Sequence, residues 1–269
     1  MSDSTKVKIV TGWSKPGGST IAHINLCNLL NDNGIDCTLY GPDVWHLDKC
    51  KSDKSENLRE ESNDIIISHF CRLNSVRVKE NECRHIYSCH ETNIAPIDQM
   101  NLEDYESIHF VSDFQKKWHS VNHPSVVIPN VVEDLKPSPL GTGACGIIGS
   151  LDIHKQAHVS IQRAMWDGWE KVFLFGLVND VSYAKQYIEP LLQRYEGKIH
   201  YQGHVDDKQK MYDSIDAVYH SSKRETFNYL KAECEKTGVS YRGLDSAEPN
   251  AEYLEKEEIL ELWKNTLKL

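Results

Sequence analysis

The stretch VKIVTGWSKPGGSTIAHINLCNLLNDNG, residues 7–34, decides the fold. It opens with an apolar run, crosses a loop that contains Gly17 and Gly18, and continues with apolar residues at helical spacing. The pair Asn33-Gly34 then supplies a helix stop signal. These features predict a strand over 6–11 and a helix over 20–31, the repeating unit of a parallel sheet covered by helices. The apolar helical positions are Ile21, Ile24, Leu26, Leu29 and Leu30.

The same alternation of short apolar runs and helical stretches recurs along the whole chain of 269 residues. In the first half it predicts strands at 6–11, 37–40, 64–68, 85–88, 108–112 and 126–129. A segment rich in proline and glycine, 133–143, then interrupts the pattern and resembles an interdomain hinge with flexible points in 136–143. Beyond it the pattern restarts, with strands expected at 145–149, 172–175, 199–201, 217–219 and 239–242.

This organisation predicts an α/β protein built from two Rossmann-like domains. We expect an N-terminal domain over 1–135, a C-terminal domain over 143–249 and a C-terminal helix over 250–269. The tail is amphipathic, with apolar residues at helical spacing. In such sheets ligands bind at the carboxyl ends of the strands, so the residues that follow strands are the candidates for a site.

Composition limits the kind of partner and the compartment. A formal net charge of −10 argues against nucleic acid or an anionic membrane as the main partner. The chain starts MSDSTK without an apolar signal core, and no later segment approaches a membrane span. Eight scattered cysteines form no C-x-x-C pair, which favours reduced thiols in the cytoplasm and makes a zinc site unexpected.

The glycine loop almost matches the phosphate-binding pattern G-x-x-x-x-G-K-[ST], but Gly18 stands where the lysine should be. Gly17 and Gly18 allow close approach of the backbone to a ligand, and Ser19 or Thr20 can cap the following helix. The helix start can then hold a phosphate or sugar hydroxyls. A turn needed only to pack the helix on the sheet is an equally good interpretation.

Polar residues follow several other expected strands. His69 and His90 come directly after two neighbouring apolar runs, and His90 is followed by Glu91 and Asn93. Lys155 lies shortly after the first strand of the second half, where it can meet an anion. Taken singly, a histidine here is more often structural, and a lysine is more often a solvated surface residue.

Two glutamates follow the penultimate strand of the second half. Glu225 falls before a predicted helix and Glu233 lies within it, with seven residues between them. Carboxylates so placed can accept hydrogen bonds from the vicinal hydroxyls of a sugar or a ribose. Two glutamates on a helix are, however, usually only solvated.

Taken in order, these motifs resemble those of the retaining GT-B glycosyltransferases of family 4. The match runs over nearly the whole chain, and the E-x7-E motif that joins Glu225 to Glu233 is its most specific element. The other motifs are PGG (16–18), HETN with His90, FVSDF with Ser112, IPN (128–130), GSLDIHK ending in Lys155, FLFG with Gly176, and YQGHVDD with Gly203.

The resemblance implies transfer of a sugar, with retention, from a nucleotide-diphosphate sugar. It implies a donor bound mainly by the second domain and an acceptor (a glycan, a lipid-linked or a small molecule) bound by the first. His90, Lys155 and Glu225 would be catalytic, with Lys155 neutralising the diphosphate without a metal ion. The missing loop cation would thus come from the other domain when the hinge closes. Further donor-binding positions would be Gly17, Gly18, Ser150, Gly176, Arg224, Thr226, Phe227 and Glu233.

The chain also departs from the family pattern. The family commonly has arginine where Ser150 stands, and glycine and valine where Asn228 and Tyr241 stand. The chain is shorter than typical members by about a hundred residues, roughly one small domain. A non-catalytic or degenerate nucleotide-sugar-binding module on the same fold is therefore the alternative. A P-loop phosphotransferase is a third reading, disfavoured because the loop lacks its lysine.

Overall fold

The computed structural model describes residues 5–12, 17–42, 47–70, 83–91, 97, 101–244 and 253–269. The chain divides into two compact units, one made of Met1–Val132 with Asn250–Leu269 and the other of Glu133–Pro249. Each unit is built on its own parallel sheet, which confirms the predicted α/β architecture. The C-terminal segment belongs to the first unit, although the rest of that unit ends at Val132.

The first unit contains a seven-stranded sheet in the order β3-β2-β1-β4-β5-β6-β7. Every recorded strand pair is parallel, and β1 occupies the interior with Val7 opposite both Cys37 and Ile65. The six predicted strands are present, and β3 is the one that the apolar pattern missed, because its three residues are polar and lie at the edge of the sheet. The strands are β1 Val7–Thr11, β2 Cys37–Gly41, β3 Ser52–Lys54, β4 Ile65–His69, β5 Arg84–Cys89, β6 Ser107–Phe110 and β7 Ser125–Val127.

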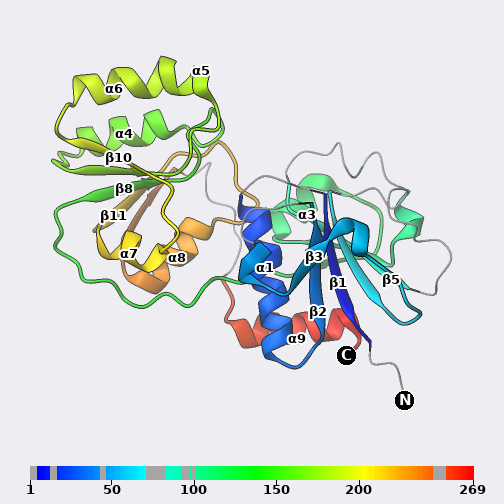
Figure 1. Cartoon of the computed structure of the whole chain (residues 1–269). Coiled ribbons are helices and arrows are strands. Elements are labelled where there is room, and N and C mark those ends of the chain that lie inside the picture. Colours follow the sequence, from blue (N-terminus) through cyan, green and yellow to red (C-terminus); the bar gives the residue numbers. More distant parts are fainter. Residues whose placement is uncertain are drawn as a thin grey trace. The chain divides into compact units, whose positions relative to one another are not determined.

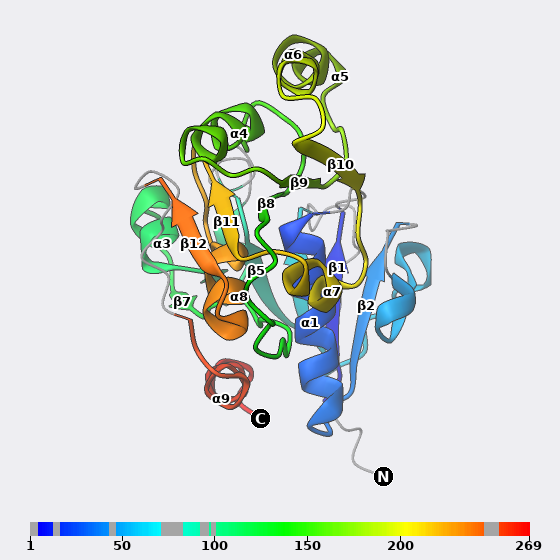
Figure 2. The same cartoon turned by 90° about the vertical axis from the view of Figure 1, so that its left-hand side faces the viewer.

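Helices α1 (Gly18–Asp32) and α9 (Lys256–Leu267) pack against this sheet and contact each other (Figures 1 and 2). The apolar residues of α9 complete a core cluster with Leu30 and Ile67, which is why the amphipathic tail folds onto the first unit. A capping box of Glu255 and Glu258 defines the start of α9. Helix α3 of this unit spans Asp113–His119 and begins with Ser112 as its N-cap.

The predicted capping of α1 by Ser19 or Thr20 is wrong. Helix α1 begins at Gly18 with Gly17 as its N-cap, and no side chain caps its start within the described residues. Ser19 and Thr20 therefore lie inside the first turn rather than before it. The backbone of Gly17 is extended, a conformation open to any residue.

The second unit contains a five-stranded parallel sheet in the order β10-β9-β8-β11-β12. Helices α4, α5 and α6 cover one face and α7 and α8 cover the other (Figure 1). The five strands predicted for this half are present: β8 Cys145–Ile148, β9 Val172–Phe175, β10 Ile199–Gly203, β11 Ala217–His220 and β12 Ser240–Gly243. The helices are α4 Ala157–Trp166, α5 Val181–Tyr183, α6 Glu189–Arg194, α7 Lys208–Asp213 and α8 Tyr229–Thr237, with a π-helical turn over Ala184–Ile188.

The segment expected to act as a hinge is hydrogen-bonded to the second unit. The carboxylate of Asp216 accepts backbone N–H bonds from Gly141, Thr142 and Gly143 at 2.7, 3.0 and 2.7 Å. Further upstream, the backbone N–H of Ser138 donates to the carbonyl of Thr237 at 2.8 Å. These bonds give the proline- and glycine-rich segment a structural role within this unit.

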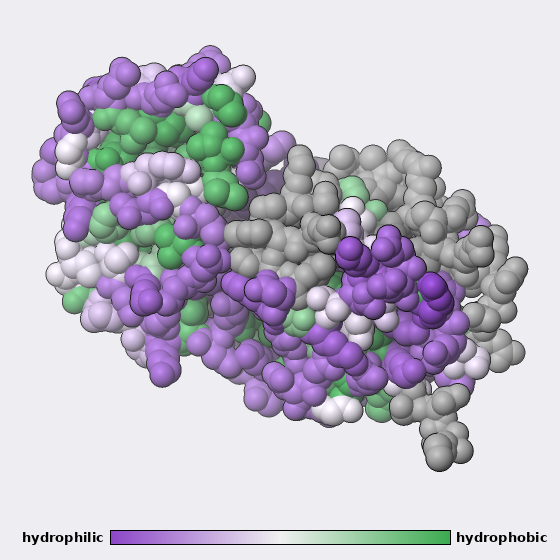
Figure 3. Space-filling view, in the orientation of Figure 1, coloured by the Kyte–Doolittle hydropathy of each residue, from purple (hydrophilic) through white to green (hydrophobic). Residues whose placement is uncertain are grey.

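The described helices include none that is long and apolar enough to cross a bilayer. The surface drawn in Figure 3 is mostly hydrophilic, and apolar residues gather on the second unit near α4 to α6. Exposed apolar side chains of that unit include Leu177, Val178 and Val181.

Candidate functional site

The strand ends of the second sheet bring two backbone segments into close contact. The chain leaves β8 at Gly149 and β9 at Gly176, with φ angles of 132° and 144°. A Cβ atom on Gly176 would lie 1.9 Å from the carbonyl oxygen of Gly149, so no other residue fits at this position. The N–H of Gly149 donates to the carbonyl of Phe175 at 2.9 Å. Gly176 therefore brings the residues that follow β8 and β9 together at one edge of the sheet.

A tight turn follows β8 and places Lys155. Asp152 organises it, because its carboxylate accepts from the backbone N–H groups of His154 and Lys155 at 2.9 Å each and from the hydroxyl of Ser150. Lys155 thus lies in the turn, two residues before α4. The Ser150 hydroxyl serves the turn, whereas an arginine at this position would have offered a second cation.

Lys155 is paired with the first glutamate of the E-x7-E motif. Its Nζ lies 2.5 Å from Oε1 of Glu225, and Nε2 of His220 lies 3.2 Å from the same oxygen. Burial alone would raise the pKa of the Glu225 carboxyl, but Lys155 and His220 outweigh it and lower that pKa to about 2. The Lys155 side chain is 34% exposed, so its ammonium remains reachable by an anion from solvent.

The loop between β11 and α8 carries the other predicted donor-binding residues. Arg224 is exposed, Thr226 is half-buried, and Phe227 is buried with its ring 4.9 Å from that of Tyr229. The loop is attached to the Lys155 turn by a backbone bond from Lys223 N–H to the carbonyl of His154, 2.9 Å long. The structure therefore brings Lys155 and Glu225 together, with Arg224 and Thr226 in the adjoining loop.

Glu233 lies in a second, buried ionic cluster on α8. Its Oε1 accepts from Lys208 Nζ at 2.7 Å and its Oε2 from the Tyr212 hydroxyl at 2.7 Å. Lys208 also contacts Glu133 at 2.9 Å. Burial alone would lower the pKa of Lys208, but Glu233 and Glu133 outweigh it and raise that pKa above its ordinary value. Glu233 is only 2% exposed, so in this arrangement it acts as the centre of an internal ion-pair network.

We expect Glu233→Gln to lower the free energy of unfolding of the second unit by about 3 kcal/mol, because it leaves the buried Lys208 ammonium with Glu133 alone. Urea denaturation of the purified chain measures the change. Glu235→Gln, on the exposed side of the same helix, is the matched control and should change stability by less than about 0.5 kcal/mol.

The double variant Glu233→Gln/Lys208→Met separates the pair from the position. If the buried pair carries the effect, removing both charges restores most of the stability that Glu233→Gln loses. An equally unstable double variant, or a Glu233→Gln chain as stable as the parent, would contradict this account.

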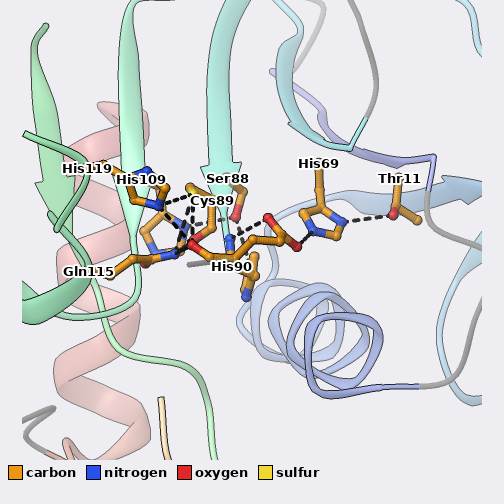
Figure 4. A network of polar contacts seen from close by, with 9 residues as sticks. Thr11, His69, Ser88, Cys89, His90, His109, Gln115 and His119 are labelled. Atoms are coloured by element: carbon orange, nitrogen blue, oxygen red, sulfur yellow. Dashed lines mark hydrogen bonds and ion pairs between the residues drawn. The ribbon is translucent and has the colours of Figure 1, made fainter. Parts of the chain in front are cut away.

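In the first unit, His90 follows β5 and takes part in a hydrogen-bonded line (Figure 4). The Ser88 hydroxyl lies 3.0 Å from His90 Nε2 and 2.9 Å from His109 Nδ1. His109 Nε2 lies 2.8 Å from the carbonyl of Ile128, which can only accept, so this nitrogen carries the hydrogen. Burial lowers the pKa of His109 to about 4, which leaves the ring neutral and its Nδ1 an acceptor near pH 7.

The tautomer of His90 follows from this line. Ser88 gives its single hydrogen to His109 Nδ1 and therefore accepts from His90 Nε2. Burial and then the His23 ring lower the pKa of His90 well below its ordinary value, so that ring is neutral too. Its Nδ1 is consequently unprotonated and can accept a hydrogen bond but cannot donate one.

Glu91 holds the neighbouring histidine and the loop after β5. His69 Nε2 donates to Glu91 Oε1 at 2.7 Å, and Thr11 Oγ1 lies 3.0 Å from His69 Nδ1. The Glu91 carbonyl accepts from Gln115 and His119 of α3, at 2.9 and 2.8 Å (Figure 4). His69 is itself fully buried, so it supports the loop from below, whereas the sequence had suggested that it reaches the rim of a cleft.

A fourth histidine completes a cluster of imidazole rings, which are tilted or edge-on to one another. The ring centroid of His23, on α1, lies 4.6 Å from those of both His69 and His90. Its ring lies near the Ser19 backbone, but neither nitrogen has a hydrogen-bond partner among the described residues. A cavity of about 10 Å³, the size of one water molecule, is lined by His23, Ser88, His90, His109, Asn130 and Trp263.

These histidines are not arranged as a metal centre. Within the part of the chain that the structure describes, no group of three or more His, Cys, Asp or Glu residues could hold a metal ion. Of the glycine loop, Gly17 and Gly18 are described, whereas Lys15 and Pro16, like Asn93, lie outside the described residues.

Sequence reasoning missed several residues that complete these sites. His220 immediately precedes the SSKRE segment and could have been noticed as a strand-end residue. Lys208, Tyr212, His23 and His109 carry no such signal, because only the packing of separate helices and strands brings them to their partners.

Neither a protein-family model nor a curated protein matches the chain in sequence. Its fold, however, is shared with solved glycosyltransferase structures. Anabaena Alr3699/HepE, solved in complex with UDP-glucose, is 14% identical with a TM-score of 0.71, over 98% of this chain and 91% of that one.

Two further similar structures are named for the transfer of different sugars. The lipopolysaccharide outer core galactosyltransferase WaaB is 13% identical with a TM-score of 0.56, over 91% of this chain and 82% of that one. The pneumococcal O-GlcNAc transferase GtfA, in complex with UDP and GlcNAc, is 16% identical with a TM-score of 0.60, over 76% of this chain and 56% of that one. At these identities the likeness concerns the fold. The chain thus has the two-sheet GT-B fold of these glycosyltransferases.

Proposed function

We propose that this chain is a glycosyltransferase that moves a sugar from a nucleotide-diphosphate sugar, in the first instance a UDP-sugar, to an acceptor. The observation that carries the proposal is Lys155, held at the strand ends of the second unit by Glu225 and still partly exposed. The fold shared with HepE, which was solved with UDP-glucose, supports the choice of donor. The acceptor class, a glycan, a lipid-linked or a small molecule, stays open.

In the proposed reaction the bond between the anomeric carbon and the diphosphate oxygen breaks while a bond to the acceptor oxygen forms. The electron pair of the broken bond stays on the diphosphate oxygen. The diphosphate also takes up the proton that the acceptor hydroxyl loses. Lys155 stabilises the charge that develops on the leaving group, and Gly176, which packs directly on the backbone of Gly149, would hold the strand ends beside the donor in place. Retention of configuration, independence of metal ions and a cytoplasmic location belong to this proposal.

Further roles are carried over from the motif resemblance. Glu225 would orient the donor sugar, and Arg224, Thr226 and Phe227 would line the donor site beside it. Glu233 would bind the ribose in exchange for its bonds to Lys208 and Tyr212, since its side chain is otherwise buried. In the first unit, His90 would accept a hydrogen bond through Nδ1, and the helix start at Gly17 and Gly18 would offer N–H groups to a phosphate or a sugar.

A thermal-shift screen with UDP, GDP, ADP and dTDP, followed by incubation with the matching sugar nucleotides in EDTA, tests the proposal. We expect stabilisation by UDP and slow hydrolysis of a UDP-sugar even without acceptor. A chain that binds none of the four nucleotides would contradict the proposal. Binding without turnover would favour the alternative, a non-catalytic nucleotide-sugar-binding module. One observation supports this alternative: Ser150 bonds to Asp152 and supplies no second cation.

A further inference from the structure

Two positions at which the chain departs from the glycosyltransferase motifs contact each other. The side-chain Nδ2 of Asn228 donates to the hydroxyl of Tyr241 at 2.6 Å. Oδ1 of Asn228 accepts from the backbone N–H of Lys231 at 3.2 Å and so caps α8. This cap orients the amide, because once its oxygen faces the helix its NH2 group faces Tyr241. A glycine and a valine at these positions could not form this contact.

The contact continues to the donor-site carboxylate. The Tyr241 hydroxyl lies 2.9 Å from Nδ1 of His220, a residue only 4% exposed at the end of β11. In the parallel register of β11 with β12, Val218 lies opposite Tyr241 and His220 lies two residues after Val218, so the side chains of His220 and Tyr241 lie on the same face of the sheet. The other ring nitrogen of His220, Nε2, lies 3.2 Å from Glu225 Oε1. Hydrogen bonds thus run from the cap of α8 to His220, and a close polar contact without hydrogen-bond geometry leads on to Glu225.

The donors and acceptors along this line are compatible in one direction. The amide of Asn228 donates to the Tyr241 oxygen, and the Tyr241 hydrogen is directed to His220 Nδ1. With Nδ1 accepting, the ring hydrogen is on Nε2, which lies 3.2 Å from Glu225 Oε1, an anion already paired with Lys155, but outside hydrogen-bond geometry. From Asn228 to His220, each donor therefore faces a group that can accept its hydrogen.

We propose that Asn228, Tyr241 and His220 are positioning residues that hold the Glu225–Lys155 pair in its place. The catalytic consequence rests on the proposed function, whereas the orientation of His220 can be measured on the free protein.

The first test is Tyr241→Phe, which removes one hydroxyl and keeps the ring. Two-bond ¹H–¹⁵N spectra of the free protein report the state of both His220 nitrogens. We expect a parent spectrum with the hydrogen on Nε2 and a hydrogen-bonded Nδ1, and in the variant a displaced Nδ1 resonance. Tyr219→Phe is the matched control, because the Tyr219 hydroxyl bonds to Asp167 and Trp169 elsewhere in this unit and should leave the His220 signals unchanged.

The second test is Asn228→Asp, which keeps the oxygen that caps α8 but replaces the donating NH2 group with an accepting oxygen. The Tyr241 hydrogen is then drawn towards the new carboxylate and away from His220. We expect the same displacement of the Nδ1 resonance as in Tyr241→Phe, with α8 still capped. If neither variant changes the His220 resonances, the proposal is overturned, whether or not the chain turns over a sugar nucleotide.

With a donor identified, kinetics give an independent readout. We expect Tyr241→Phe and Asn228→Asp to lower kcat by about tenfold, with the donor KM changed by about twofold or less, because the pair is misplaced but not removed. An unchanged kcat in both variants would overturn the catalytic part. A chain that binds no nucleotide, but whose His220 signals respond as described, would refute the proposed function and leave the positioning of Glu225 standing.

Discussion

Replacing Lys155 with alanine is expected to lower the turnover number for sugar transfer by about 10²–10³, the scale for losing one preorganised electrostatic donor. The leaving diphosphate gains its extra charge mainly in the transition state, so a cation aimed at it affects kcat more than ground-state binding. Donor affinity should therefore fall by less. Steady-state kinetics with the UDP-sugar that the screen identifies measure both effects, and Lys198→Ala, which removes an exposed surface cation paired with Glu170 in the same unit, is the control.

The variant also leaves Glu225 without its main partner, and a second substitution separates the two causes. In Lys155→Ala/Glu225→Gln the unpaired carboxylate is gone, so recovery of turnover would show that the unpaired negative charge, and not the missing cation, caused the loss. A Lys155→Ala enzyme as fast as the parent would mean that another group, such as Arg224, holds the phosphate. Ser150→Arg, which supplies a second cation beside Lys155, should raise turnover.

The first unit is expected to lose stability steeply as the pH falls from about 6.5 to about 4.5. Burial and then the neighbouring His69 lower the pKa of His23 well below 6.5, and burial, followed by His23, does the same for His90. Burial lowers the pKa of His109 to about 4. Between the ordinary histidine pKa and these lowered pKa values, the unfolded chain binds protons on the three rings and the native chain does not. Stability is therefore fully present above pH 6.5 and is lost as the pH falls towards the native pKa values.

Burial also lowers the pKa of His85 in this unit, so with four such groups the slope can approach about 5.6 kcal/mol per pH unit, at about 1.4 kcal/mol for each proton. Hydrogen exchange of β4 and β5 amides between pH 7 and 5 reports the first unit specifically. His23→Phe, which keeps a flat ring in place of one without hydrogen-bond partners among the described residues, should reduce the slope by about one quarter. His200→Gln, in the second unit, is the control. A slope that is shallow in the parent, or unchanged by His23→Phe, would contradict the assignment.

Some secondary-structure elements of this protein can be predicted from its sequence and others cannot. Buried strands such as β4, with its run Ile65 to Ile67, can be predicted from the sequence. Both faces of a parallel sheet are covered, so the run is uniformly apolar. Strand β3 cannot be predicted in this way, because Ser52 to Lys54 lie at an exposed edge of the sheet, where the side chains need not be apolar. The start of α1 was misplaced for a related reason. Gly17, Ser19 and Thr20 are all residues that can precede the first turn of a helix, and the local sequence does not determine which of them is the N-cap.

The sites show the same division. The motif spacing located Lys155 and Glu225 as strand-end residues, but they meet because β8 and β11 are neighbours in the sheet, and strand order is not written in local periodicity. Glu233 was located by its distance from Glu225, yet its burial depends on Lys208 and Tyr212, which α7 brings to it. The sequence by itself determined the succession of strands and helices and the polar residues that end the strands, because both depend on near neighbours in the chain. Only the tertiary structure decided which of those residues are paired, buried or protonated, because charge partners and burial depend on segments that are distant in sequence and adjacent in space.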